Sequence, residues 1–121
     1  MQEGADKMHT YMMKSPTYYA VKVKGRQEFL KNGKDFYYVL ENEDEIDEFA
    51  KKFNMDWFWN MRKGVLSFKD KSEGVKLNRP EHVQIGDVVV AYNDWEKWRV
   101  DVWTFEDFEK KFIKIDEQKG N

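Results

Sequence analysis

Apolar and polar residues alternate along several short segments of this chain, which is the pattern of half-buried β-strands. The clearest alternation runs through 18–24 (YYAVKVK) and 97–103 (KWRVDVW). The runs 35–40, 57–61 and 88–92 are rich in aromatic and β-branched residues and predict further strands. Because a period of two residues places apolar side chains on one face, these segments predict a sheet with a buried side.

The segments between these strands are more polar. Lys63-Gly64 suits a turn into a further strand at 65–69, which would complete a hairpin. We expect residues 26–34 (RQEFLKNGK) to form one short helical turn or a loop. Residues 70–84 are expected to form a polar loop that contains a short strand at 75–77.

Residues 43–53 have the spacing of an amphipathic helix. Its apolar stripe comprises Ile46, Phe49, Ala50 and Phe53. Asn42 precedes this helix and Glu45 stands three residues later, which predicts a capping box at its first turn. Acidic residues in the first turn, and Lys51 and Lys52 in the last, also suit the helix dipole.

A second helix is predicted for 105–112, where Thr104 can act as the N-cap. Its apolar stripe comprises Phe105, Phe108 and Phe112. Strands and helices in this order are typical of an α+β domain: a mainly antiparallel, twisted sheet with two helices packed on one face. The expected organisation is a flexible arm over 1–15, a single small domain over 16–115 and a disordered tail over 116–121.

Aromatic residues are unusually frequent, at 17% of the 121 residues. Each buried ring removes ~150–250 Å² from water, so about half of them suffice for a small core. The remaining rings can cover a surface, and we therefore expect the chain to form a homodimer or a higher homo-oligomer. If the chain is a monomer, these rings instead form a surface for a flat ligand or a partner protein.

The charge balance narrows the classes of function. Lys plus Arg (21) nearly matches Asp plus Glu (23), for a net charge of −2. General nucleic-acid binding is therefore not expected, because such proteins carry a basic excess. The absence of cysteine excludes disulfides, and the isolated His9 and His82 argue against a metal site. No apolar run approaches ~20 residues, so we expect no contact with a membrane and a cytoplasmic protein.

Four stretches carry a resemblance to a known family: 20-AVKVKG-25, 46-IDEF-49, 85-IGDVVV-90 and 105-FEDFEKKF-112. Their order resembles that of small phage and prophage proteins named after a Pro-Gly-Asp-Tyr-Gly stretch, over roughly residues 16–113. The chain departs from that pattern, since Ile85 replaces the proline and Val88 the aromatic residue. That family has no assigned chemistry. The resemblance implies a phage or prophage origin, and hence the cytoplasm of a bacterial host.

The strongest candidate site combines tryptophans with arginines on two predicted strands. We single out five residues as a ligand- or partner-binding set: Trp57, Trp59, Arg62, Trp98 and Arg99. A planar group can stack on a ring while an arginine pairs with an anion, which suits a nucleotide-like ligand. The alternative is that these tryptophans, together with Trp95 and Trp103, only pack in the core or at an interface between subunits.

Two acidic features offer further chemistry. The run 41–48 (ENEDEIDE) either mimics a phosphate backbone or is simply an exposed helix start. Asp101 with Glu106 or Asp107 could perform acid–base work, but no nucleophile, metal set or phosphate loop accompanies these carboxylates. No catalytic, cofactor-binding or metal-binding residue is predicted.

The sequence therefore predicts a small non-enzymatic phage-type binding protein that counters a host function, most plausibly a defence system. It would sequester a nucleotide-like molecule, which suits the aromatic and arginine residues, or block a host protein, which suits the acidic helix. One alternative is a structural phage protein that only associates with itself. Another is an enzyme that acts on a small anionic substrate.

Overall fold

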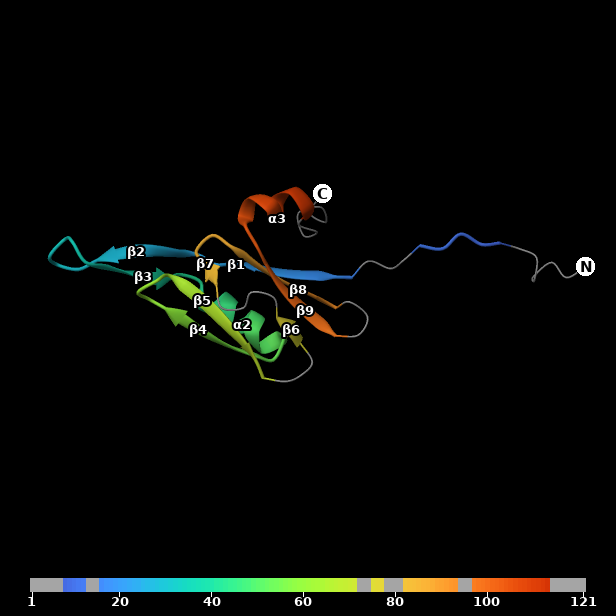
Figure 1. The fold of residues 1–121 in the computed structure, drawn as a ribbon, viewed down its shortest axis with the longest axis horizontal. Helices are drawn as coiled ribbons and strands as arrows, with labels where there is room; N and C mark the ends of the chain where they lie inside the picture. The colour runs from blue at the N-terminus through green and yellow to red at the C-terminus, as the bar shows by residue number, and fades with distance from the viewer. Residues whose placement is uncertain (1–7, 13–15, 72–74, 78–81, 94–96, 114–121) are drawn as a thin grey trace, which may run out of the picture.

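The computed structural model shows one α+β domain made of mostly antiparallel strands and two helices (Figure 1). It describes residues 8–12, 16–71, 75–77, 82–93 and 97–113. The predicted tail 116–121, much of the arm 1–15 and Trp95 lie outside the described residues. The strands are β1 (Tyr18–Lys22), β2 (Gly25–Phe29), β3 (Phe36–Leu40), β4 (Met55–Asn60), β5 (Val65–Asp70), β6 (Val75–Leu77), β7 (Val83–Gln84), β8 (Val88–Asn93) and β9 (Trp98–Trp103). The helices are α2 (Glu43–Lys52) and α3 (Phe105–Lys111).

The described strands form three sheets. The largest has the order β1-β8-β9-β6, a second pairs β2 with β3, and the third has the order β4-β5-β7. Every pair is antiparallel except β6 with β9, which is parallel. The strands and helices predicted from alternation and helical spacing are confirmed within one or two residues at each end.

The prediction of a helical turn or loop for 26–34 is wrong, because its first residues belong to β2. This strand pairs with β3 over five residues, from Gly25 opposite Leu40 to Phe29 opposite Phe36. Its sequence, GRQEF, has little strand character of its own. The cross-strand partners in β3 therefore decide its conformation. The loop predicted for 70–84 likewise contains β7, which pairs with β5.

The helices lie on opposite faces of the four-stranded sheet, so the prediction that both pack on one face is wrong. Phe53 at the end of α2 contacts Tyr19 of β1 (ring centroids 5.7 Å apart). On the other face, Lys22 of β1 places its Nζ 3.6 Å from the centroid of the Phe105 ring in α3. Tyr18 contacts Phe112, at the end of α3, with ring centroids 5.0 Å apart. In Figure 1, α3 lies above β1 and α2 below it.

The physical reason lies in β8, which is apolar on both faces. Val89 and Ala91 belong to the main core beneath the sheet, while Val88 and Val90 point to the α3 side. All four are buried. A strand that is apolar without interruption needs cover on both sides, and α3 supplies the second cover.

The main core lies between α2, the four-stranded sheet and the β4-β5-β7 sheet. Its buried residues are Val21, Val23, Leu40, Ile46, Phe49, Ala50, Phe53, Met55, Leu66, Phe68, Val83, Val89, Ala91 and Val100. The predicted apolar stripe of the first helix is thus confirmed as a core face. No helix within the described residues has the length and apolar composition needed to cross a membrane.

The ends of the helices differ from one another. At α3 the predicted cap is confirmed, since Thr104 Oγ1 accepts a hydrogen bond from the backbone N–H of Asp107 at 3.2 Å. At α2 the predicted capping box is wrong. Asn42 stands at the N-cap position but its side chain makes no cap bond, because it bonds instead to the backbone between β1 and β2.

Candidate functional site

Trp57 and Trp59 of β4 turn inward and pack against the core. The Trp57 indole Nε1 donates a hydrogen bond to Asp47 Oδ1 of α2 at 3.0 Å. The Trp59 Nε1 donates to the backbone carbonyl of Tyr38 in β3, also at 3.0 Å. Both indoles therefore join β4 to neighbouring elements, and their N–H groups are used within the domain.

Trp98 and Arg99 of β9 point to opposite faces of their sheet, as the alternation predicts. Trp98 packs against the core and contacts Phe53, with ring centroids 4.8 Å apart. Arg99 lies on the α3 face, directly across from Tyr92 in β8. Burial and the neighbouring Asp101 raise the pKa of Tyr92, while the charge of Arg99 opposes that rise.

Arg62 lies in the exposed turn between β4 and β5, where its backbone N–H donates to Asn60 Oδ1 at 3.0 Å. The five residues singled out from the sequence thus lie in three places. The three tryptophans pack against the core, Arg62 lies in an exposed turn, and Arg99 lies on the α3 face of the four-stranded sheet. The structure does not bring them together into one stacking site. Trp57, Trp59 and Trp98 are partly buried where they pack against the core.

An exposed apolar surface lies elsewhere, on the β2–β3 hairpin. We call it the hairpin patch and define it by four side chains: Phe29 (57% exposed), Leu30 (49%), Phe36 (43%) and Met61 (52%). The rings of Phe29 and Phe36 are 5.5 Å apart, and Phe36 meets Tyr38 edge-on at the same distance. The Tyr38 N–H bonds to the Met61 carbonyl at 2.8 Å, which links the turn after β4 to the hairpin.

The hairpin that carries the patch has a well-bonded tip. Asn32 Oδ1 accepts from the N–H groups of Lys34 (2.9 Å) and Asp35 (3.0 Å). The Asn32 Nδ2 also donates to Asp35 Oδ2, and Leu30 N–H bonds to the Asp35 carbonyl, both at 2.8 Å. Figure 1 shows the hairpin extending away from the rest of the domain. Its apolar side chains are therefore held in place although no described element covers them.

A signal in the sequence could have revealed this surface. Asn32-Gly33 is a dipeptide typical of hairpin turns, and it is flanked by Phe29-Leu30 and by Phe36. Gly33 adopts a φ of 71°, a conformation that glycine accepts without strain. The polar residues of 26–34 concealed the hairpin, because they lack the apolar alternation of a buried strand.

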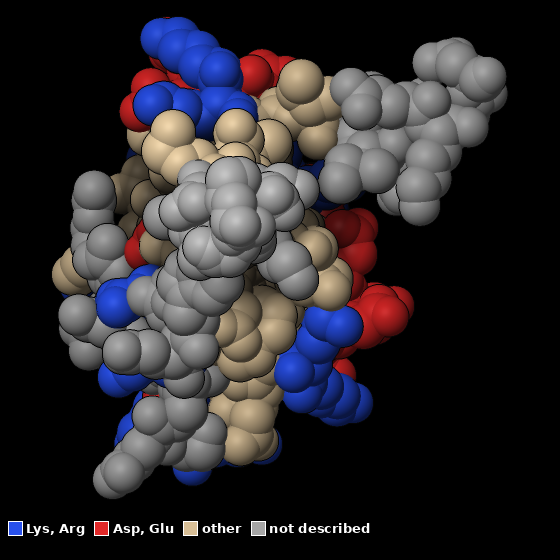
Figure 2. All heavy atoms as spheres, turned by 90° about the vertical axis from the view of Figure 1, so that its right-hand side faces the viewer, with Lys and Arg blue, Asp and Glu red and all other residues tan. Residues whose placement is uncertain are grey.

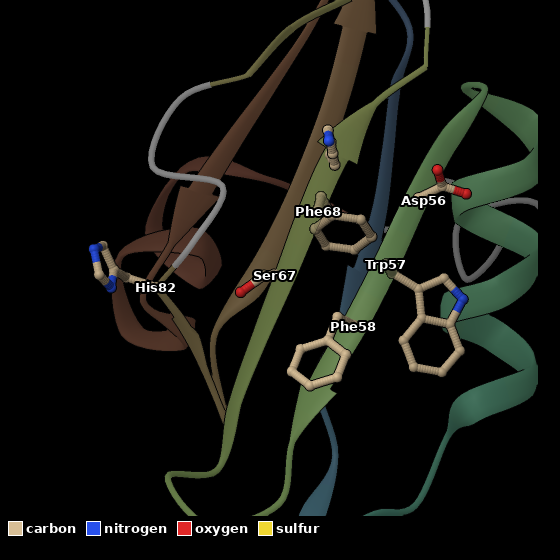
Figure 3. A pocket seen from close by; sticks show the side chains of 7 residues that line it. Asp56, Trp57, Phe58, Ser67, Phe68 and His82 are labelled. Carbon is tan, nitrogen blue, oxygen red and sulfur yellow. The ribbon is translucent and has the colours of Figure 1, made fainter.

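The outer face of the β4-β5-β7 sheet carries an open hollow of about 680 Å³ (Figure 3). It is lined by Asp56, Trp57, Phe58, Ser67, Phe68, Lys69 and His82. Figure 3 shows Phe58 on β4 beside Ser67 on β5, with His82 beyond Ser67. Trp57 points the other way, toward α2. We call this region the sheet hollow.

The acidic run 41–48 is partly neutralised by its neighbours. Glu41 pairs with Arg26 at 3.2 Å, and Glu45 lies 4.0 Å from the Lys24 ammonium. Asp47 pairs with Lys51 at 3.0 Å. On the face that Figure 2 shows, Lys and Arg side chains are interspersed with Asp and Glu. These pairs favour an exposed helix start over a mimic of a phosphate backbone.

Two of the three carboxylates considered for acid–base work are engaged. Asp101 forms a side-chain hydrogen bond with Tyr92, and Glu106 pairs with Lys110 at 3.5 Å. In the described part of the chain, no group of three or more His, Asp and Glu side chains could hold a metal ion.

No family model matches this chain, and searches of curated proteins and of solved structures gave no match either. The resemblance to small phage and prophage proteins therefore stays a hypothesis. Function has to be argued from the surfaces of the domain itself.

Proposed function

We propose that this chain is a non-enzymatic binding protein that recognises a protein partner through the hairpin patch. The observation that carries the proposal is the exposure of Phe29, Leu30 and Phe36 on the projecting β2–β3 hairpin, and of Met61 in the turn bonded to it. Contiguous exposed apolar side chains are rare on soluble monomers and mark interaction sites. Aromatic residues and methionine are also the residues that interface centres favour.

Charged residues around the patch define the partner further. Lys31 and Lys34 lie in the hairpin loop, and Arg62 and Lys63 follow Met61 in the adjacent turn. Asp35 is the acidic residue of the loop, and it bonds to Asn32. A partner with an apolar groove and an acidic rim would complement this arrangement in both packing and charge.

Of the two modes expected from the sequence, a protein-blocking mode fits better than capture of a nucleotide by the tryptophan and arginine set. Two of those indoles use their N–H groups internally, and Trp98 and Arg99 point apart. In the setting that the phage resemblance implies, the partner is a host protein of a defence system, and binding counters its function in the bacterial cytoplasm.

The test is a pull-down from a bacterial lysate followed by reconstitution with the purified partner. We expect the double variant Phe29→Ser/Phe36→Ser to lose the captured protein, with at least about tenfold weaker binding in the reconstituted pair. Both rings are more than two-fifths exposed, so the variant should fold, which circular dichroism can check. The matched control is Phe58→Ser, which removes another exposed ring. Equal capture by both variants would exclude the hairpin patch.

A second candidate is self-association through the edge strand β1. The Lys22 carbonyl and the Lys24 N–H point away from β8 and bond to Asn42. Because backbone groups alternate in direction along a strand, the N–H and C=O of Ala20 also point away from β8, toward the open edge of the sheet. Tyr18, Tyr19 and Ala20 are exposed there. Such an edge can pair with a second copy of the chain.

Light scattering tests this second candidate. A homodimer formed through the edge would have twice the chain mass of 14.7 kDa. Ala20→Pro removes an outward N–H without removing a bond to β8, so it should return a dimer to the monomer. A monomer at high protein concentration would exclude self-association and leave the hairpin patch as the surface for a different protein.

A further inference from the structure

Phe58 lies near the middle of β4, yet its ring is 65% exposed. Alternation turns Trp57 and Trp59 toward the core and Phe58 away from it. The ring therefore contributes little to the packing of the domain and is accessible to a ligand. Since an exposed ring on a sheet presents a flat apolar surface, it can act as a stacking platform.

The space beside this ring is open because its cross-strand partner is small. Phe58 stands directly opposite Ser67 of β5. The hydroxymethyl group of Ser67 leaves the sheet hollow, of about 680 Å³, next to the ring. This volume lies within the range of small-molecule sites, which is ~300–1,000 Å³.

A cation borders the hollow. Lys69 follows Ser67 by two residues on the same face of β5, which makes it a diagonal neighbour of Phe58, about 7–8 Å away between backbone positions. The carboxylate opposite Lys69, on Asp56, pairs with Lys71 at 3.2 Å. Among the described residues Lys69 has no ion pair of its own. His82 adds an imidazole to the rim.

We propose that the sheet hollow binds a planar aromatic ring that carries an anionic group, and that a mononucleotide is the ligand class. The base stacks on Phe58, the phosphate pairs with the Lys69 ammonium, and the His82 imidazole supplies a further hydrogen bond. This site does not depend on the hairpin patch, because it uses different side chains.

The experiment titrates the protein with adenosine 5′-monophosphate and follows backbone amide NMR shifts. Adenosine, which lacks the anion, and ribose 5-phosphate, which lacks the ring, separate the two contributions. We expect saturable binding of the nucleotide with shifts at residues of β4 and β5, and weaker binding of both partial ligands.

Two variants and a control sharpen the test. Phe58→Ala should weaken nucleotide binding by about tenfold or more, and Phe58→Trp should restore it. Lys69→Gln should weaken binding of the nucleotide by about tenfold and leave adenosine unchanged, because only the nucleotide carries the anion. Tyr11→Ala, which removes an 84% exposed ring outside both surfaces, should have no effect.

Two results would overturn the proposal. The first is no binding of the nucleotide at millimolar concentration to a folded protein. The second is binding that Phe58→Ala leaves intact, which would place the ligand elsewhere. Neither result bears on the hairpin patch, because the pull-down is decided by the double variant Phe29→Ser/Phe36→Ser.

Discussion

Asn42 and Lys24 are joined by a hydrogen bond in which the backbone N–H of Lys24 donates to Asn42 Oδ1 at 2.9 Å. The same side chain donates from Nδ2 to the carbonyl of Lys22 at 2.7 Å. Asn42 is only 7% exposed. One amide thus satisfies a donor and an acceptor where the chain leaves β1 for β2, and it does so from the start of α2.

We therefore predict that Asn42→Ala lowers the free energy of unfolding by about 2–4 kcal/mol, because two backbone groups lose their partner in a largely buried site. The matched control is Asn32→Ala, which removes backbone contacts of the same kind from an exposed loop and should cost less than about 1 kcal/mol. Urea denaturation measures both. Equal losses in the two variants would show that burial of Asn42 does not matter.

Gly64 lies in the turn between β4 and β5, where it packs against Tyr38 of the β2–β3 hairpin. It has a φ of 67°, and a Cβ added there would lie 2.9 Å from the Tyr38 ring. Gly64→Ala should destabilise the domain by about 1–3 kcal/mol, since it adds backbone strain and displaces the ring. Gly33→Ala is the control, because Gly33 has a φ of 71° with nothing within 4 Å of the added Cβ. Thermal denaturation should show the smaller loss for Gly33.

The bond between Trp57 and Asp47 predicts a response to acid. Two contacts hold the pKa of Asp47 below its ordinary value of 3.8: the hydrogen bond from the Trp57 indole N–H, which has the larger effect, and the bond to the Lys51 ammonium. The stabilisation that follows is present above that ordinary value and is lost as the pH falls through the lowered pKa. We expect Trp57 fluorescence to change over that acidic interval, and Asp47→Asn to reduce the change. A response identical in this variant would assign the effect to other carboxylates.

Arg99 and Tyr92 predict a response to alkali. Burial and Asp101 raise the pKa of Tyr92 above its ordinary value of 10.0, while Arg99 lowers it. The stability linked to Tyr92 is present below the ordinary value and is lost as the pH rises through the raised pKa. Arg99→Gln should raise the Tyr92 pKa further and move this loss to higher pH. NMR titration of labelled tyrosine measures the shift.

The same variant tests the binding role expected for Arg99 from the sequence. If Arg99 meets an anionic group of the partner, Arg99→Gln should weaken binding by ~1.5–3 kcal/mol. If the hairpin patch is the interface, partner binding should be unchanged, because Arg99 lies across from Tyr92 on the α3 face of the four-stranded sheet. An affinity measurement with the reconstituted partner decides between these outcomes.

The candidate site was only partly accessible to sequence reasoning. The sequence shows that Trp57, Trp59 and Trp98 are unusual, but the same residues at the same spacing would serve either to stack on a ligand or to pack inside the domain. The choice depends on Asp47 and on the Tyr38 carbonyl, which reach the indoles from distant parts of the chain. Phe29 and Phe36, the exposed rings of the hairpin patch, lie in a segment predicted as a helical turn or loop and in a predicted strand.

What the sequence by itself determined is local periodicity. The alternation in 18–24 and 97–103 and the stripe in 43–53 each record which side of a segment must avoid water, so the elements and the α+β class followed from them. Tertiary structure alone decided which helix covers which face, since periodicity says that a face is buried and not by what. Tertiary structure also made β2 a strand, through its pairing with β3. It likewise decided that the Asn42 side chain bonds to the backbone at Lys24 and does not cap α2. Both outcomes depend on contacts between residues remote in the chain.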